Sequence, residues 1–234
     1  MIKHLCLGLK VKNLIRIINV SAQHSMLCQT LYIFAHILLF LMKILLIDNY
    51  DSFTYNLFHL IKAASTEEDS VEIILNDKLS VDTARHFDRI IISPGPGLPS
   101  EVPLLKEIIL TLDQQTPVLG ICLGHQAIAE SYGASIFNFD KPAHGVSSTI
   151  LIHDHSDLFR NIDAQISVGR YHSWNVSKQG FPDCLKITAS DIDGNIMALA
   201  HRQYPVFGVQ FHPESFITPD GETIISNFLN YRQV

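Results

Sequence analysis

Short apolar runs alternate with longer segments of helical periodicity through the first half of the chain, from residue 43 onward. Runs of apolar residues without alternation are typical of strands buried on both faces, whereas apolar residues spaced three and four apart mark helices. The apolar runs lie at 44–47, 71–75, 89–92 and 118–121, and the helical segments lie at 53–64, 103–112 and 125–132. This order predicts βαβ units, and therefore a mostly parallel sheet flanked by helices.

The pattern changes after Ser135, where shorter alternating segments replace the strand-and-helix rhythm. Strands are predicted at 149–153, 196–201 and 206–211, and a closing helix at 222–231. No linker rich in Gly, Ser or Pro separates the two halves, and no internal repeat is visible. We therefore expect one α/β domain over residues 42–234, with a mostly parallel central sheet and a smaller antiparallel portion.

Local details of two segments can also be predicted. In the segment 53–64, Phe53, Leu57, Leu60 and Ile61 share one helical face, and the preceding Asp51 or Ser52 is expected to cap the helix. The acidic cluster 67–69 that follows is expected to be a solvated loop.

Residues 1–41 differ from the rest, being basic at the start and nearly uncharged and apolar over 31–41. A signal peptide would need a small-residue cleavage site, which is not seen here. A membrane anchor would need about 20 predominantly apolar residues, and the run is interrupted by polar residues. We favour a third interpretation, in which 1–41 is an extension outside the fold and Met42 is the true start.

Composition narrows the class of protein. The 234 residues are 47% apolar and 17% charged, which excludes disorder, and the formal net charge of −6 argues against nucleic-acid binding. Cysteines at 6, 28, 122 and 184 form no C-x-x-C pair, and no histidine cluster has metal-ligand spacing. We expect no metal site, no disulfide framework and a reducing, cytoplasmic environment, with membrane attachment disfavoured.

Cys122 stands between two glycines, in the order Gly120-Ile-Cys122-Leu-Gly124, directly after an apolar run and before a helical segment. This is the arrangement of a nucleophile elbow with cysteine as the nucleophile, in which small neighbours permit a strained turn. A thiol placed there lies at a helix N-terminus, which favours the thiolate. Taken alone, a buried and unreactive cysteine is an equally good interpretation.

A candidate base follows a second buried-strand pattern, in Val206-Phe-Gly-Val-Gln-Phe-His212-Pro-Glu214. His212 can act as a general base, and Glu214 can accept a hydrogen bond from the imidazole and fix its tautomer. A histidine and a glutamate that merely end a strand are the plain alternative. Together with the elbow, the pattern favours a Cys122, His212 and Glu214 triad.

The pair G-I-C-L-G-H-Q and G-V-Q-F-H-P-E-S resembles the class I glutamine amidotransferases. The resemblance extends over about residues 43–232, and the segments at 47–56 and 93–97 are similar in particular to the amidotransferase subunits of anthranilate synthase and aminodeoxychorismate synthase. It implies a flavodoxin-like, three-layer fold with a Cys122, His212 and Glu214 triad.

The resemblance also implies a glutamine-binding set. Gly95, Pro96 and Gly97 would form a turn facing the cysteine, and the amides of Gly97 and Leu123 would bind the oxyanion. The residues Gln126, Ser173 and Trp174 match positions that hold the substrate, although an aliphatic residue is expected where Trp174 stands. The Pro-Gly-Pro-Gly turn independently suits a rigid loop at the carboxyl edge of the sheet, where ligands of α/β proteins bind.

The activity implied is hydrolysis of L-glutamine through a Cys122 thioester, with no cofactor in this chain. Ammonia would pass to a large chorismate-binding synthase subunit, component I, for anthranilate or aminodeoxychorismate synthesis. The segments 48–52 and 141–145 would face that partner. Two alternatives stay open: an amidotransferase subunit for another acceptor, in guanylate or carbamoyl-phosphate synthesis, and a catalytically silent regulatory subunit.

Overall fold

A large sheet runs through the part of the chain that the structure, a computed structural model, describes: residues 41–112, 114–139 and 145–232. Its strand order is β2-β1-β3-β4-β11-β10-β9-β6-β7. The strands of this sheet are β1 (Lys43–Asp48), β2 (Ser70–Leu75), β3 (Arg89–Ile92), β4 (Val118–Ile121), β6 (Val146–Ile152), β7 (Gln165–Arg170), β9 (Leu185–Asp191), β10 (Ile196–His201) and β11 (Val206–Val209).

The first five strands in this order are parallel, as the sequence predicts. Their short apolar runs are buried on both faces, since successive residues pack into opposite cores. Ile44 and Leu46 of β1 join one hydrophobic cluster, and Leu45 and Ile47 join the other. The pattern of unbroken apolar residues therefore reflects a sheet covered on both sides.

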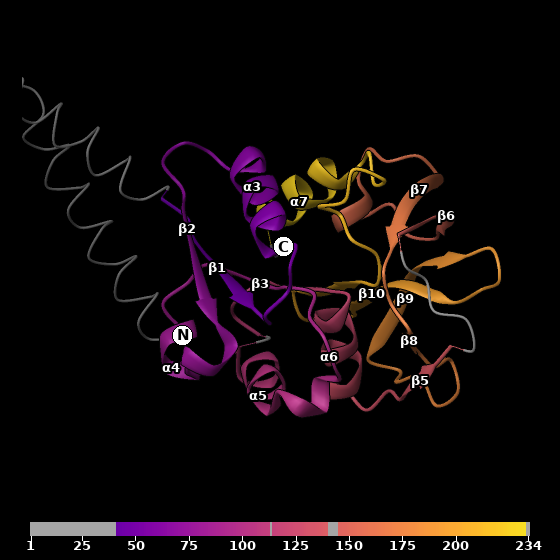
Figure 1. Ribbon diagram of the computed structural model, residues 1–234, viewed down its shortest axis with the longest axis horizontal. Coiled ribbons are helices and arrows are strands. Elements are labelled where there is room, and N and C mark those ends of the chain that lie inside the picture. Colours follow the sequence, from indigo (N-terminus) through magenta and orange to yellow (C-terminus); the bar gives the residue numbers. More distant parts are fainter. Residues whose placement is uncertain (1–40, 113, 140–144, 233–234) are drawn as a thin grey trace, which may run out of the picture. The chain divides into compact units, whose positions relative to one another are not determined.

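Helices cover the two faces, which gives three layers (Figure 1). One face carries α3 (Thr54–Ala64) and α7 (Gly221–Leu229), and the other carries α4 (Val81–Ala84), α5 (Pro103–Leu112) and α6 (Leu123–Ser131). Short 3₁₀ turns lie at η1 (Asn76–Lys78), η2 (Pro99–Glu101) and η3 (Asp157–Phe159). The predicted fold class is confirmed.

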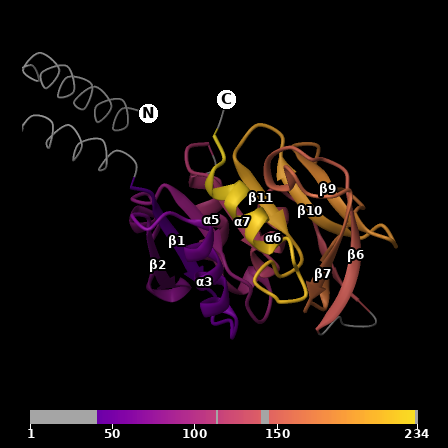
Figure 2. The same cartoon turned by 90° about the horizontal axis from the view of Figure 1, so that it is seen from above.

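The antiparallel portion mostly continues the main sheet. Strands β10, β9, β6 and β7 extend it antiparallel beyond β11, at the end opposite β1 and β2 (Figure 2). A separate two-stranded sheet pairs β5 (Ile136–Asn138) with β8 (Trp174–Val176). The strands β5, β7, β8 and β9 were not located by the sequence pattern.

One local prediction was wrong, and a second was wrong at one residue. The N-cap of α3 is Phe53, without a side-chain cap, because the Asp51 carboxylate accepts from the Phe53 amide and lies before the helix. In the acidic cluster 67–69, Glu67 and Glu68 are exposed as predicted, whereas Asp69 is buried, since its carboxylate accepts from the amides of Met42 and Thr66. A short acidic side chain that accepts from nearby amides can leave the solvent, which composition alone does not show.

The predictions for residues 1–41 concern a segment of which only Leu41 is described, and they stay predictions. Residues 42–234 form a compact unit. Among the described residues, no helix has the length and apolar character needed to cross a bilayer.

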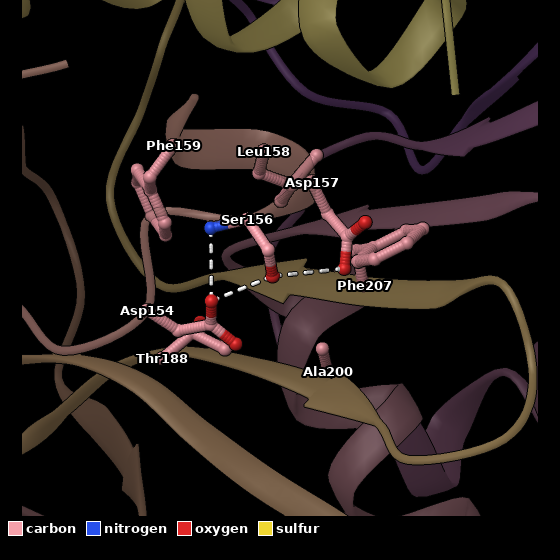
Figure 3. A pocket seen from close by; sticks show the side chains of 8 residues that line it. All are labelled: Asp154, Ser156, Asp157, Leu158, Phe159, Thr188, Ala200 and Phe207. Carbon is pink, nitrogen blue, oxygen red and sulfur yellow. Dashed lines mark hydrogen bonds between the residues drawn. The ribbon is translucent and has the colours of Figure 1, made fainter. Parts of the chain in front are cut away.

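A small cavity beside the 154–159 turn has a volume of about 10 Å³, and its lining side chains are shown in Figure 3. The Asp154 carboxylate accepts hydrogen bonds from the Ser156 amide at 2.9 Å and from Lys186 Nζ at 2.6 Å. A space of this size holds about one water molecule. The cavity is therefore too small for a ligand, and the polar groups beside it stabilise the turn.

Ile91, fully buried in β3, provides a test of the layered core. Ile91→Ala is expected to lower the free energy of unfolding by about 2–5 kcal/mol, because it removes apolar contacts and leaves a cavity. The matched control is Ile192→Ala, since the Ile192 side chain is 75% exposed, and it should change stability by less than about 0.5 kcal/mol. Urea denaturation of both variants checks this, and equal effects would contradict the assigned core.

Candidate active site

Cys122 lies at the sharp turn between β4 and α6, in a backbone conformation that few residues adopt. Its φ is 51° and its ψ is −98°. A positive φ in a residue with a side chain is strained, and such strain persists only where the surroundings enforce it. The turn directs the end of the strand into the helix, and the thiol lies at the helix start.

The two flanking glycines enforce this turn by close packing. A Cβ atom on Gly120 would lie 2.3 Å from the Gly124 carbonyl carbon, and one on Gly124 would lie 2.7 Å from the Ile92 carbonyl oxygen. Both approaches are shorter than side chains allow. The strand, the turn and the neighbouring strand β3 therefore interlock only with glycine at these positions.

Backbone amides at the start of α6 are available beside the sulfur. The helix's first intrahelical bond runs from the Gln126 amide to the Cys122 carbonyl at 3.1 Å. The amides of Leu123 and Gly124 precede this bond, and they carry the partial positive charge of the helix N-terminus. A negative oxygen that develops near the sulfur can accept from these amides.

His212 and Glu214 form a buried pair on the segment that follows β11. His212 Nδ1 donates to Glu214 Oε1 at 2.7 Å, and both side chains are at most 5% exposed. The Tyr171 and Phe53 rings pack against the imidazole, with centroids at 4.9 and 6.5 Å. The backbone is anchored by the His212 amide, which donates to the Gly169 carbonyl at 3.0 Å.

The charge state of His212 depends on its neighbours. Burial disfavours the imidazolium, but the Cys122 sulfur and the Glu214 carboxylate outweigh burial and raise the pKa of His212 to about 10. The Nδ1 atom is bound to Glu214. The Nε2 atom is buried, and no atom of the described residues lies in position to form a hydrogen bond with it. Nε2 is therefore the nitrogen that can exchange a proton with a group reacting at the sulfur.

A cleft of about 430 Å³ opens at Cys122. Its volume lies within the range of sites that hold small molecules. It is lined by Gly95, Pro96, Gly97, Leu98, Cys122, Leu123, Gln126, Tyr171, His172, Ser173 and Trp174. Every residue predicted to bind substrate therefore borders this cleft, beside the predicted nucleophile.

The wall formed by Ser173 and Trp174 is fixed through its backbone. The Ser173 carbonyl accepts from the Phe139 amide at 2.7 Å. The Trp174 carbonyl accepts from Gln126 Nε2 at 3.0 Å and from His172 Nδ1 at 2.9 Å. The unexpected tryptophan side chain is therefore compatible with the wall, because the backbone makes these contacts.

A buried ion pair supports the same wall. Arg170 Nη1 donates to the Asp191 carboxylate at 2.9 Å, and Arg170 Nε donates to His172 Nε2 at 3.1 Å. Burial and the Arg170 charge lower the pKa of His172 to about 4. His172 is thus neutral near pH 7, with Nε2 as acceptor and Nδ1 as the donor to Trp174.

The segment 48–52, predicted to face a partner, is only partly exposed in the structure. Tyr50 is 57% exposed, whereas Asn49 is buried, with its side-chain nitrogen donating to the Ser93 carbonyl at 2.9 Å. Asn49 therefore ties two loops together and does not belong to an outer face. Of the segment 141–145, residues 141–144 lie outside the described residues, and that prediction stays untested.

Sequence reasoning missed Gln210, whose side-chain nitrogen lies 3.6 Å from Cys122 Sγ, and the Arg170, His172 and Asp191 network. The place of Gln210 follows from the pairing of β4 with β11, in which Val209 lies opposite Ile121, and the sequence alone does not give this pairing. Among the described residues, no group of three His, Cys, Asp or Glu side chains is placed to hold a metal ion.

Comparison with known proteins shows the family of this chain. The family model for class I glutamine amidotransferases matches residues 45–231. Anthranilate synthase component 2 of Methanothermobacter marburgensis is 45% identical over 193 residues, which cover 80% of this chain and 97% of that protein. Aminodeoxychorismate synthase component 2 of Klebsiella aerogenes is 40% identical, over 80% of this chain and 99% of that protein.

The fold is also similar to solved structures. A crystal structure described as that of a GMP synthase subunit from Thermoplasma acidophilum has a TM-score of 0.72 and 24% identity. The match covers 81% of this chain and 92% of that chain. At this identity the likeness shows the fold alone.

Gly120→Ala is expected to lower stability by about 1–3 kcal/mol, because the new Cβ meets the Gly124 backbone. It should also slow alkylation of Cys122 by iodoacetamide at least about tenfold, since the turn that presents the sulfur must shift. The control is Gly180→Ala, which strains a residue at φ 69° but meets nothing within 4 Å. Equal alkylation rates in the two variants would contradict the role of the Gly120 contact.

The raised pKa of His212 predicts a pH-dependent contribution to stability. The pKa is about 10 in the folded protein against an ordinary 6.5, so the contribution is complete below 6.5 and is lost as the pH rises through about 10. Urea denaturation should show the stability difference between the wild type and the double variant His212→Gln, Glu214→Gln shrinking by at least about 1 kcal/mol across this window. A constant difference would contradict the assignment.

Proposed function

The chain belongs to the class I glutamine amidotransferase family, and we propose that it hydrolyses L-glutamine and passes the ammonia to a larger chorismate-converting subunit. One observation carries the hydrolysis. Cys122, on its strained turn, and Leu123 at the start of α6 line one cleft, and the His212 and Glu214 pair adjoins the Cys122 sulfur. Relatives named as components 2 of two synthases, at 45% and 40% identity, support the role within a larger enzyme.

In the first half-reaction, the Cys122 thiolate attacks the side-chain carbonyl carbon of glutamine. The carbonyl oxygen becomes an oxyanion, which the amides of Leu123 and Gly97 stabilise. The imidazolium of His212 then gives its Nε2 proton to the amide nitrogen, the carbon–nitrogen bond breaks, and ammonia leaves. A γ-glutamyl thioester remains on the sulfur, and His212 is neutral.

In the second half-reaction, neutral His212 accepts a proton from water at Nε2 as the water oxygen attacks the thioester carbon. The tetrahedral intermediate collapses, the carbon–sulfur bond breaks, and the thiolate returns with glutamate as the product. Glu214 keeps the imidazole oriented and stabilises its cationic form in both halves. These steps consume no cofactor, and we propose that this chain needs none.

We further propose that glutamine enters with its side-chain amide at Cys122 and its amino-acid end against Gln126, Ser173 and Trp174. These residues line the cleft together with the Gly95–Gly97 turn. The backbone of that wall is held by several hydrogen bonds, so it forms a rigid template for the substrate. The close fit of the amino-acid end would discriminate glutamine from simple amides.

The acceptor of the ammonia is proposed to be chorismate on component I, giving anthranilate or aminodeoxychorismate according to the large subunit. Exposed aromatic side chains on the segments that carry or contact His212 support a protein partner: Phe53 packs against the His212 ring, Tyr50 lies three residues before Phe53, and Phe216 follows Glu214 by two residues. A silent regulatory subunit would not need the buried His212 and Glu214 pair. We propose that both proteins act in the cytoplasm, where the thiol stays reduced.

The test measures glutamate release by the full chain, alone and mixed separately with large subunits of anthranilate synthase and of aminodeoxychorismate synthase. At least one large subunit is expected to activate hydrolysis. Cys122→Ser should lower the rate at least about 10³-fold, because the nucleophile is lost. Cys184→Ser is the matched control, since Cys184 lies outside the cleft, and it should retain the rate.

Three results would contradict the proposal. Full glutamate release by Cys122→Ser would exclude Cys122 as the nucleophile. Hydrolysis that is unchanged by both large subunits, in a folded protein, would point to a different acceptor. No hydrolysis under any condition would favour the silent regulatory role.

A further inference from the structure

Gln210 lies directly beside the sulfur of Cys122 because of the pairing between β4 and β11. The strands are parallel with Val209 opposite Ile121, and the Cys122 amide donates to the Val209 carbonyl at 2.9 Å. The next residue, Gln210, is fully buried, and its own amide donates to the Met197 carbonyl. The backbone therefore holds the Gln210 side chain in one position beside the Cys122 sulfur.

The side-chain amide of Gln210 is one step in a chain of hydrogen bonds. Its Nε2 atom lies 3.6 Å from Cys122 Sγ, within the range for a sulfur acceptor. Its Oε1 atom accepts from Gln126 Nε2 at 3.2 Å. Gln126 Nε2 also donates to the Trp174 carbonyl at 3.0 Å, so both of its hydrogens are used.

The direction of this chain is determined at its far end. The Trp174 carbonyl can only accept, so Gln126 must present its nitrogen, and the second hydrogen of that nitrogen must meet an acceptor on Gln210. If the Gln210 amide were reversed, two NH₂ groups would face each other. Gln210 therefore presents N–H to the sulfur, and a backbone carbonyl that cannot reverse enforces this orientation.

We propose that Gln210 is a further catalytic residue, which donates a hydrogen bond to the Cys122 thiolate, and that Gln126 is the positioning residue that holds Gln210 in the donating orientation. This deepens the proposed function, on which it rests. A hydrogen bond to a charged sulfur is stronger than one to a neutral sulfur, so the donor favours the thiolate before attack and again as it leaves the thioester.

A purely structural role explains the buried amides of Gln126 and Gln210 less well than a role at the sulfur. Two buried amides cost desolvation, and apolar side chains of the same shape could fill the space at little or no cost to stability. The amides here have an acceptor at one end and the reacting sulfur at the other. What the pair provides beyond packing is a donor of fixed direction at Cys122.

The experiment measures iodoacetamide alkylation of Cys122 against pH in the full chain, with the modified peptide resolved by mass spectrometry. Gln210→Met keeps the shape and removes the donor, and the midpoint of the alkylation profile is expected to move up by about one pH unit. Gln210→Glu should move it further, since a carboxylate repels the thiolate. Gln126→Met should shift it less, and adding it to Gln210→Met should have no further effect.

Asn227→Leu is the matched control, because it removes another buried side-chain amide, one that lies on α7 and donates to the Leu158 and Arg160 carbonyls. Its profile should coincide with that of the wild type. Thermal unfolding identifies which variants are folded, and if neither Gln210 variant is, the Gln126→Met profile is decisive. An unshifted midpoint in the folded variants, or an equal shift in the control, would overturn the proposal.

Alkylation requires neither glutamine nor a partner, so the two proposals can fail separately. A shifted midpoint in a protein that never hydrolyses glutamine would support the role of Gln210 and contradict the proposed function. An unshifted midpoint in a protein with normal partner-dependent hydrolysis would contradict the role of Gln210 and support the proposed function.

Discussion

The close packing of Gly120 against Gly124 is the contact on which the site depends. It brings the end of β4 against the start of α6, and this leaves Cys122 at φ 51° with its sulfur at the helix N-terminus. The same contact places Leu123 beside the Gly95 turn, where a Cβ on Gly95 would lie 3.0 Å from the Leu123 side chain. Cys122, the helix amides and the opposing loop are thus brought together by one interlocked region of backbone.

The sheet brings the remaining groups to this point. Strands β3, β4 and β11 lie side by side and parallel, so the loop after β3, the turn after β4 and the segment after β11 meet at one edge. These carry the Gly95–Gly97 turn, Cys122, and Gln210 with the His212 and Glu214 pair. The site therefore follows the general rule that α/β sheets bind ligands at the carboxyl ends of their strands.

Much of this could be predicted from sequence, for physical reasons. Strands β1, β3 and β4 are unbroken apolar runs because they are covered on both faces, and the elbow glycines are visible because no other residue fits there. The missed strand β7 mixes polar and apolar residues at the edge of the sheet, where its burial is one-sided. The missed strand β9 lies inside the sheet, and its apolar pattern is broken by the buried polar residues Thr188, Ser190 and Asp191. Asn49 and Gln210 were not identified as buried, since their polar groups are satisfied only by partners distant in sequence.

The proposed hydrolysis requires that Cys122 is the nucleophile of a glutamine site. A glutamine analogue that carries a chloromethyl ketone in place of the side-chain amide tests it most directly, with the labelled peptide identified by mass spectrometry. We expect label to be incorporated at Cys122 and glutamine to protect against this labelling. Label at another residue such as Cys184, or incorporation at Cys122 that glutamine does not slow, would contradict it.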